Sequence, residues 1–234
     1  MLRDFDKEGY KTGGKEWQRV ANMVRQAITD DIKSSSTGKM PKKWLRKIVL
    51  SDKHDDLAKI KKIGGLMTLL VTQNSRSRIV RDTARAIVKG YNIKPKDFQN
   101  EYWALQHWIQ NNIRYVFDTG EQFQTPQRQL LDWYRGYDGA DCDCMTMLFL
   151  SLARALGHNK IAIGLLDSRG DATLSHAIAF VKLPKAEPPF GDKWIPVELT
   201  KEKPLGWITP KATKIIVIPI GQGSFTPKKA GRMK

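Results

Sequence analysis

The sequence predicts an α+β fold, in which a helical N-terminal half precedes one buried helix and an antiparallel sheet. Apolar residues recur at spacings of three and four in the first hundred residues, which is the pattern of amphipathic helices. A nearly uninterrupted apolar stretch, 145–156, indicates a buried central helix. Short runs rich in β-branched residues follow it, separated by turn residues, and these predict the strands of a meander.

The first half of the chain contains five expected helices. Ser34 to Gly38 should end a helix at 15–33, and proline suits the first turn of a helix at 41–50. Gly64 and Gly65 weaken the middle of a helix at 55–71. Gly90 follows the fourth as a stop signal, and Pro95 opens the fifth. The expected ranges are 15–33, 41–50, 55–71, 75–89 and 95–112.

The second half is expected to be richer in strands. Residues 114–117 have a strand-like composition, and Thr125 begins an expected loop that leads to Gly139. The buried helix should end at Gly157. Four strands are expected after it, at 160–166, 176–183, 193–199 and 213–220, and residues 221–234 read as a loose basic tail.

Positive charge is placed unevenly along the chain. Its 234 residues include 40 Lys+Arg and 24 Asp+Glu, which gives a net charge of +16. The first hundred residues carry +12, residues 101–220 sum to zero, and the last fourteen residues carry +4. Such asymmetry favours a basic interaction surface joined to a neutral domain. We therefore expect a basic helical arm (residues 1–64), a domain (65–220) and a basic tail (221–234).

The basic arm has three possible roles. It can meet an acidic protein surface, contact nucleic-acid phosphates non-specifically through residues 1–100, or form a solvated helical face. No motif that reads a nucleic-acid sequence accompanies it. The candidate partner-binding residues are Lys42, Lys43, Arg46, Lys47, Lys61 and Lys62.

Composition argues against several classes of protein. The chain has no run of eighteen apolar residues, so no membrane span is expected, and residues 1–10 lack the apolar core of a signal peptide. Cys142 and Cys144 are too close in sequence for ordinary disulfide geometry, so both are expected to be free thiols in a reducing compartment. Neither a zinc ligand set nor a calcium loop is complete, so no metal or cofactor is expected.

Cys142 precedes the buried helix and is the candidate nucleophile. The unpaired N–H groups and partial positive charge of a helix N-terminus favour a thiolate and can stabilise an oxyanion. Asp141 and Asp143 flank this thiol, and their negative charge acts in the opposite direction by raising its pKa. The sequence thus predicts a thiol subject to two competing electrostatic influences.

A base and an orienting carboxylate are available on two expected strands. His176 begins one of these strands, and Glu198 lies on the next. If the strands pair antiparallel, the two side chains can lie side by side at one end of the sheet. The buried helix, packed across that sheet, would bring Cys142 to the same end, which is the arrangement that nucleophilic catalysis by a thiol requires.

Several motifs resemble the transglutaminase-like, papain-related superfamily. Gly139-Ala140-Asp141-Cys142-Asp143-Cys144 and the apolar helix that follows resemble its nucleophile helix. Ser175-His176-Ala177 resembles its histidine strand, and residues 194–200 (WIPVELT) resemble its Trp-x-Pro-Leu-Asp-Pro-Thr strand. Residues 79–88, 113–115 and 124–126 are similar to the version encoded by tailed bacteriophages. The resemblance covers roughly residues 65–200.

The resemblance implies a papain-like core in which Cys142 is the nucleophile, His176 the general base and acid, and Glu198 the orienting carboxylate. Loop position alone makes Gln124 a candidate oxyanion-hole residue. The implied function is thiol acyl transfer by a bacteriophage protein, either as a peptidase or amidase or as a transglutaminase, acting on a protein substrate.

The alternative is a non-catalytic phage assembly protein that uses the fold as a docking module. Its basic arm would then hold other virion subunits or DNA. On either hypothesis the protein is expected in the host cytoplasm and, if it is assembled, in the virion.

Overall fold

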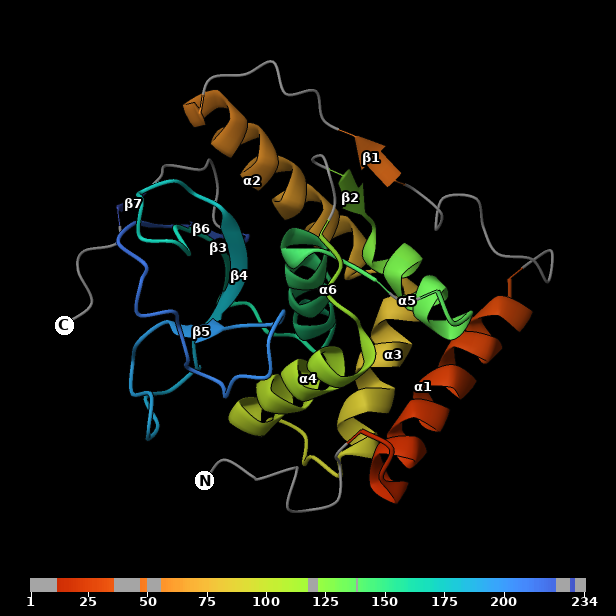
Figure 1. Cartoon of the computed structure of the whole chain (residues 1–234). Helices are drawn as coiled ribbons and strands as arrows, with labels where there is room; N and C mark the ends of the chain where they lie inside the picture. Colours follow the sequence, from red (N-terminus) through yellow and green to blue (C-terminus); the bar gives the residue numbers. More distant parts are fainter. Residues whose placement is uncertain are drawn as a thin grey trace.

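The helices pack around one central helix and against one face of a sheet (Figure 1). The computed structural model describes residues 12–35, 47–49, 56–117, 122–137, 139–221 and 228–229. The helices are α1 Lys15–Lys33, α2 Asp56–Asn74, α3 Arg78–Gly90, α4 Phe98–Asn112, α5 Pro126–Tyr134 and α6 Cys142–Ala155. The strands are β1 Lys47–Val49, β2 Gln122–Gln124, β3 Ile161–Leu166, β4 His176–Val181, β5 Ile195–Val197, β6 Ile215–Pro219 and β7 Lys228–Lys229. The α+β class is therefore confirmed.

The larger sheet is antiparallel and has the order β5-β4-β3-β6-β7. His176, the first residue of β4, pairs with Leu166 at the end of β3. On its other side β4 pairs with β5, and this ladder ends at Ala179 and Val197. The register places the start of β4 and the end of β5 at the same end of the sheet.

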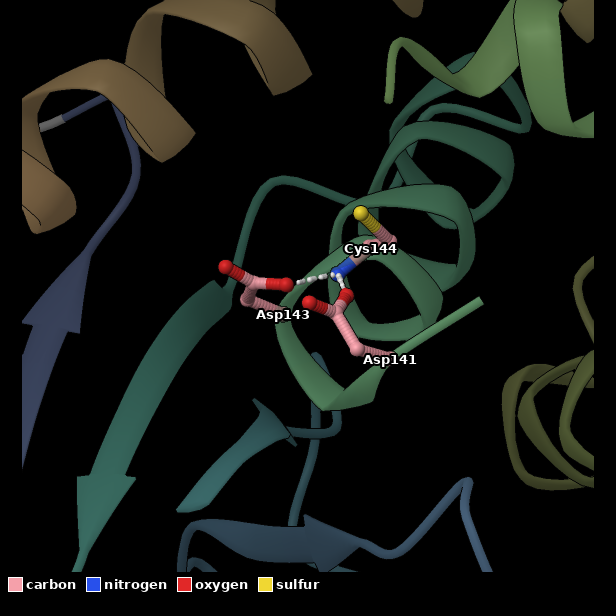
Figure 2. Close-up of side chains that lie close together, drawn as sticks. All are labelled: Asp141, Asp143 and Cys144. Atoms are coloured by element: carbon pink, nitrogen blue, oxygen red, sulfur yellow. Dashed lines mark hydrogen bonds between the residues drawn. The ribbon is translucent and has the colours of Figure 1, made fainter. Parts of the chain in front are cut away.

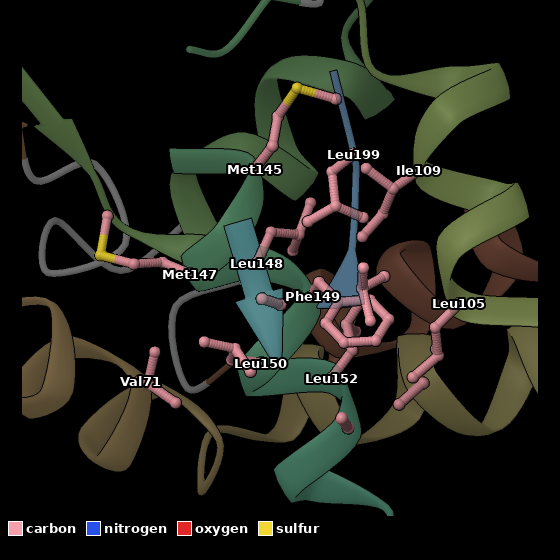
Figure 3. Close-up of a cluster of buried hydrophobic side chains, with 14 of the residues drawn as sticks. Val71, Leu105, Ile109, Met145, Met147, Leu148, Phe149, Leu150, Leu152 and Leu199 are labelled. Carbon is pink, nitrogen blue, oxygen red and sulfur yellow. The ribbon is translucent and has the colours of Figure 1, made fainter. Parts of the chain in front are cut away.

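The centre of the fold is α6, which was expected as a buried helix. Every residue of α6 from Asp143 to Ala153 is buried. The helix lies between the sheet and the other helices, and Figure 3 shows its Phe149 in a buried cluster that also includes Leu105 of α4 and Leu199. Burial on all sides explains why this sequence lacks a polar face.

The N-terminal helices α1 and α2 contribute side chains to the same core as the later helices. Helix α1 packs on α3 and buries Val20, Val24 and Ile28. Helix α2 continues through residues 64 and 65. The absence of a side chain at Gly64 leaves room for Ile218 of β6 to pack against the helix. Among the described residues, no helix has both the length and the apolar character needed to cross a membrane.

Two local expectations were wrong, one for residues 47–49 and one for the segment after Thr125. Within the expected helix 41–50, residues 47–49 form β1, which pairs with β2, since β-branched residues favour a strand when a partner strand is present. The expected loop after Thr125 is helix α5, whose N-terminus is capped by the Thr125 hydroxyl and begins with proline. Within the expected tail, β7 pairs with β6. Residues 41–46 and 50 lie outside the described part of the chain.

A buried carboxyl links α1 to α3. Asp31 of α1 has a side chain that is only 1% exposed, and its Oδ1 lies 2.7 Å from Nε of Arg78. Burial and the nearby charge of Asp82 raise the pKa of Asp31 from 3.8 to about 6, against the opposing effect of Arg78. Because the folded pKa is the higher one, this group stabilises the fold most below pH 3.8 and loses that contribution as the pH rises through about 6.

Asp31→Asn is therefore expected to stabilise the protein at pH 7.5, by about 2 kcal/mol of unfolding free energy. The gain should shrink toward zero at pH 4, where the native carboxyl is already protonated. Urea unfolding at the two pH values measures both effects. Asp30→Asn is the matched control, since Asp30 is exposed and should change stability little at either pH. A gain that did not depend on pH would contradict the expectation.

Candidate active site

Cys142 is the first residue of α6, and the residues around it fix the start of that helix. Asp141 is the N-cap: its Oδ1 accepts a hydrogen bond from the backbone N–H of Cys144 at 3.0 Å, and Oδ1 of Asp143 accepts from the same N–H at 2.7 Å (Figure 2). Just before the cap, Ala140 forms a parallel bridge with Tyr115. A Cβ at Gly139 would lie 2.9 Å from Cγ2 of Val116, so this close approach requires glycine.

His176 and Glu198 lie within hydrogen-bond distance of each other. Nε2 of His176 is 2.9 Å from Oε2 of Glu198. The other carboxylate oxygen, Oε1, accepts from the backbone N–H of Thr200 at 2.8 Å and from its hydroxyl at 2.7 Å. Glu198 is 4% exposed, so both of its oxygens are held in a largely dry environment. The extra methylene of glutamate therefore does not prevent contact with the imidazole.

Cys142 lies beside the start of β4. The backbone N–H of Ala177, the residue after His176, faces the Cys142 sulfur. Helix α6 also packs on β4. The cysteine, the histidine and the glutamate thus lie where α6 begins, β4 begins and β5 has just ended.

Cys142 is held as a thiol at neutral pH. Burial and then the negative charge of Asp143 raise its pKa from 9.0 to about 12, with a smaller contribution from Asp141. The N–H groups of Ala177 and Asp143 favour the thiolate but do not offset these effects. The flanking carboxylates act as expected, whereas the helix N-terminus by itself does not produce a thiolate.

Glu198 is held as a carboxylate. Burial by itself would raise its pKa, but the hydrogen bond and charge of His176 and the donors of Thr200 lower it below its usual value of 4.5. An ionised Glu198 can fix the orientation of the His176 ring and stabilise the ring when it gains a proton.

Gln124 lies at the end of β2, where it contacts Cys144 and α5. Its backbone N–H donates to the Cys144 sulfur at 3.2 Å, and its carbonyl accepts from the Gln129 side chain at 3.3 Å. Its side-chain oxygen is buried and has no hydrogen-bond partner among the described residues. The structure therefore leaves its role toward Cys142 a prediction.

Three potential metal ligands lie together at the start of α6. The ligand atoms of Asp141, Asp143 and Cys144 are within 4.8 Å of one another. Both carboxylates already accept from the Cys144 N–H, and burial raises the pKa of the Cys144 thiol. These contacts account for the cluster as a helix cap.

The remaining sequence candidates are only partly described by the structure. Lys61 and Lys62 are exposed on α2, the backbone of Lys47 is in β1, and Lys42, Lys43 and Arg46 lie outside the described residues. His107 and His158 are buried, and each has a polar partner: Tyr91 for His107 and Glu101 for His158. His54 lies outside the described part of the chain.

Three residues that contribute to the geometry of the site were missed from the sequence. Thr200 binds the Glu198 carboxylate, and its place two residues later in the 194–200 motif was an available signal. Gln106 and Gln110 of α4 donate to the backbone of the segment that begins with Glu198. Their i, i+4 spacing is common in helices, so it gave no specific signal.

Comparisons with known proteins give limited information. No family model matches the chain, and no curated protein matches it. Among solved structures, EGTA-treated LapG of Legionella pneumophila is similar, with a TM-score of 0.43 and 16% sequence identity over 73% of this chain and 90% of that chain. The function proposed below therefore rests on the residues of this chain.

Proposed function

We propose that this protein is a transglutaminase-like thiol acyl-transfer enzyme that uses Cys142, His176 and Glu198. The observation that carries the proposal is the 2.9 Å contact between Nε2 of His176 and Oε2 of Glu198, beside the thiol of Cys142. Since Glu198 occupies Nε2, the other ring nitrogen, Nδ1, is the one that would exchange a proton with the thiol.

In the proposed reaction, Sγ of Cys142 attacks the carbonyl carbon of a peptide or carboxamide while its proton passes to Nδ1 of His176. The carbonyl electron pair moves onto oxygen, where N–H groups at the start of α6 and the Gln124 side chain would stabilise the negative charge. When the tetrahedral intermediate collapses, His176 protonates the leaving nitrogen and a thioester remains. Water then gives hydrolysis, whereas a lysine amine gives a crosslink.

The thiol pKa of about 12 has a mechanistic consequence. A preformed thiolate is not available at neutral pH, so His176 must remove the proton as the sulfur attacks. General-base catalysis of this kind contributes about 10²–10⁴-fold to a rate. The dependence of the rate of thiol attack on His176 is therefore a direct measure of whether the site is active.

The second candidate function is a non-catalytic docking module in a phage particle. The observation that favours it is the same raised pKa, since a cysteine that stays protonated is a poor nucleophile. Bacteriophage origin and a place in the virion rest on the motif resemblance. On this proposal the basic residues of 1–64 would hold an acidic subunit or packaged DNA.

Alkylation by iodoacetamide tests the proposed function. In a Cys144→Ala background, the rate of Cys142 alkylation at pH 7.5 should fall by about a hundredfold in His176→Ala, because the base is lost. Intact-mass spectrometry over time gives the rate. Ser175→Ala is the matched control, because Ser175 is the exposed neighbour of His176 and should leave the rate unchanged. An equal rate in parent and His176→Ala would support the docking module instead.

A further inference from the structure

Two glutamine side-chain amides on α4 donate hydrogen bonds to the backbone of the segment that follows β5. Nε2 of Gln106 lies 2.9 Å from the backbone oxygen of Glu198 and 3.1 Å from that of Lys203. Nε2 of Gln110, one turn later, lies 2.9 Å from the Glu198 oxygen, 2.7 Å from that of Lys201 and 3.1 Å from that of Lys203. The two amides thus converge on the backbone carbonyl of Glu198.

The hydrogen bonds to the Glu198 carbonyl lie just beyond the point where β5 stops pairing with β4. The β4–β5 ladder ends at Ala179 and Val197, so Glu198 lies one residue beyond the last pair. Strand β5 has only three residues, and the chain then turns away toward Lys201. Ladder hydrogen bonds therefore do not fix the backbone of Glu198, although its carboxylate must meet His176.

Burial makes the Gln106 contacts costly to lose. Gln106 is fully buried, so water cannot replace its partners, and a buried donor left without an acceptor is destabilising. Gln110 is only partly buried, which makes it the better position for substitution. With Thr200 and His176 on the carboxylate and the two amides on the carbonyl, both ends of Glu198 are held.

We propose that Gln106 and Gln110 are positioning residues that set the place of Glu198 and, through it, the orientation of the His176 ring. The inference rests on the proposed function. It predicts that their effect on the reaction passes through the Glu198 carboxylate, so that the effect disappears when that carboxylate is absent.

The test uses Gln110→Glu, Gln110→Lys and p-nitrophenyl acetate as acyl donor. Attack by Cys142 on the ester releases p-nitrophenolate in a burst and leaves an acetyl thioester. Gln110→Glu keeps the shape of the side chain but replaces the donor nitrogen with an oxygen that faces three backbone carbonyls. The burst should therefore slow by about ten- to a hundredfold, with the KM of acylation unchanged. Gln110→Lys restores a donor and should recover most of the rate.

A double-mutant cycle separates positioning from general destabilisation. In a Glu198→Gln background, Gln110→Glu should add no further slowing, because the carboxylate that it acts through is already absent. Gln99→Leu is the matched control: Gln99 lies on the same helix and donates to the Pro188 carbonyl at 2.8 Å, and its loss should leave the burst rate unchanged. Additive effects of Gln110→Glu and Glu198→Gln would overturn the inference.

The failure of this inference can be distinguished from failure of the proposed function. If Cys142→Ala retains the burst, the proposed function fails. If Cys142→Ala loses the burst while Gln110→Glu keeps the parent rate, or slows it additively, only the positioning role fails.

Discussion

Cys142→Ala is expected to lower the rate of the p-nitrophenolate burst by at least about a thousandfold, because the proposed acyl intermediate forms on the Cys142 sulfur. The affected atom is Sγ, which lies beside the Ala177 N–H at the start of β4. Stopped-flow absorbance at pH 7.5 gives the amplitude and rate of the burst. The thermal midpoint should change little, because Cys142 is only partly buried.

Cys144→Ala is the matched control for this prediction. Cys144 lies two residues later and is 2% exposed, but its sulfur is placed between the Gln124 N–H at 3.2 Å and the Gln122 carbonyl at 3.5 Å. Burial also raises its pKa, so it should contribute no burst. A full burst in Cys142→Ala that disappears in Cys144→Ala would show that Cys144, and not Cys142, is the nucleophile.

Gly164→Val is expected to have the largest effect on stability, about 3 kcal/mol or more of unfolding free energy. Gly164 is in β3, between Ile178 of β4 and Val217 of β6. A Cβ at this position would overlap the ring of Phe180 and lie 3.2 Å from Cγ1 of Ile178. Phe180 is fully buried on the face of the sheet that Trp194 covers, so its ring has no free space to enter.

Urea unfolding followed by circular dichroism measures this loss. The matched control is Gly65→Ala in α2, where an added Cβ meets no atom within 4 Å. Because alanine restricts the unfolded chain and favours a helix, that substitution should stabilise the protein by about 0.5–1 kcal/mol. Equal stability of Gly164→Val and the parent would show that Phe180 can repack.

Periodicity in the sequence predicted most of the elements. The range 15–33 matches α1, and the apolar stretch at 145–156 marks most of α6, because the two patterns reflect burial on one side and on all sides respectively. The strand at 47–49 was missed because its partner, β2, lies more than seventy residues later in the chain. Helix α5 was missed although threonine followed by proline is a helix-start signal.

The candidate site was predicted less completely than the fold. Cys142, His176 and Glu198 stood out because each is a reactive residue type in a motif, and the antiparallel register of β4 and β5 brings the last two together. The amides of Gln106 and Gln110 could not be predicted, since their partners are backbone carbonyls about ninety residues away. Backbone atoms carry no sequence signature.

By itself, the sequence determined most of the helices and the strands of the larger sheet before the tail, that one helix is buried, and which residue types are available for thiol chemistry. Each of these depends on local periodicity or on the identity of a side chain. Tertiary structure alone decided that α1 joins the core, that Glu198 reaches His176, and that the Cys142 thiol remains protonated. These properties depend on burial and on distances between remote segments, which exist only once the chain has folded.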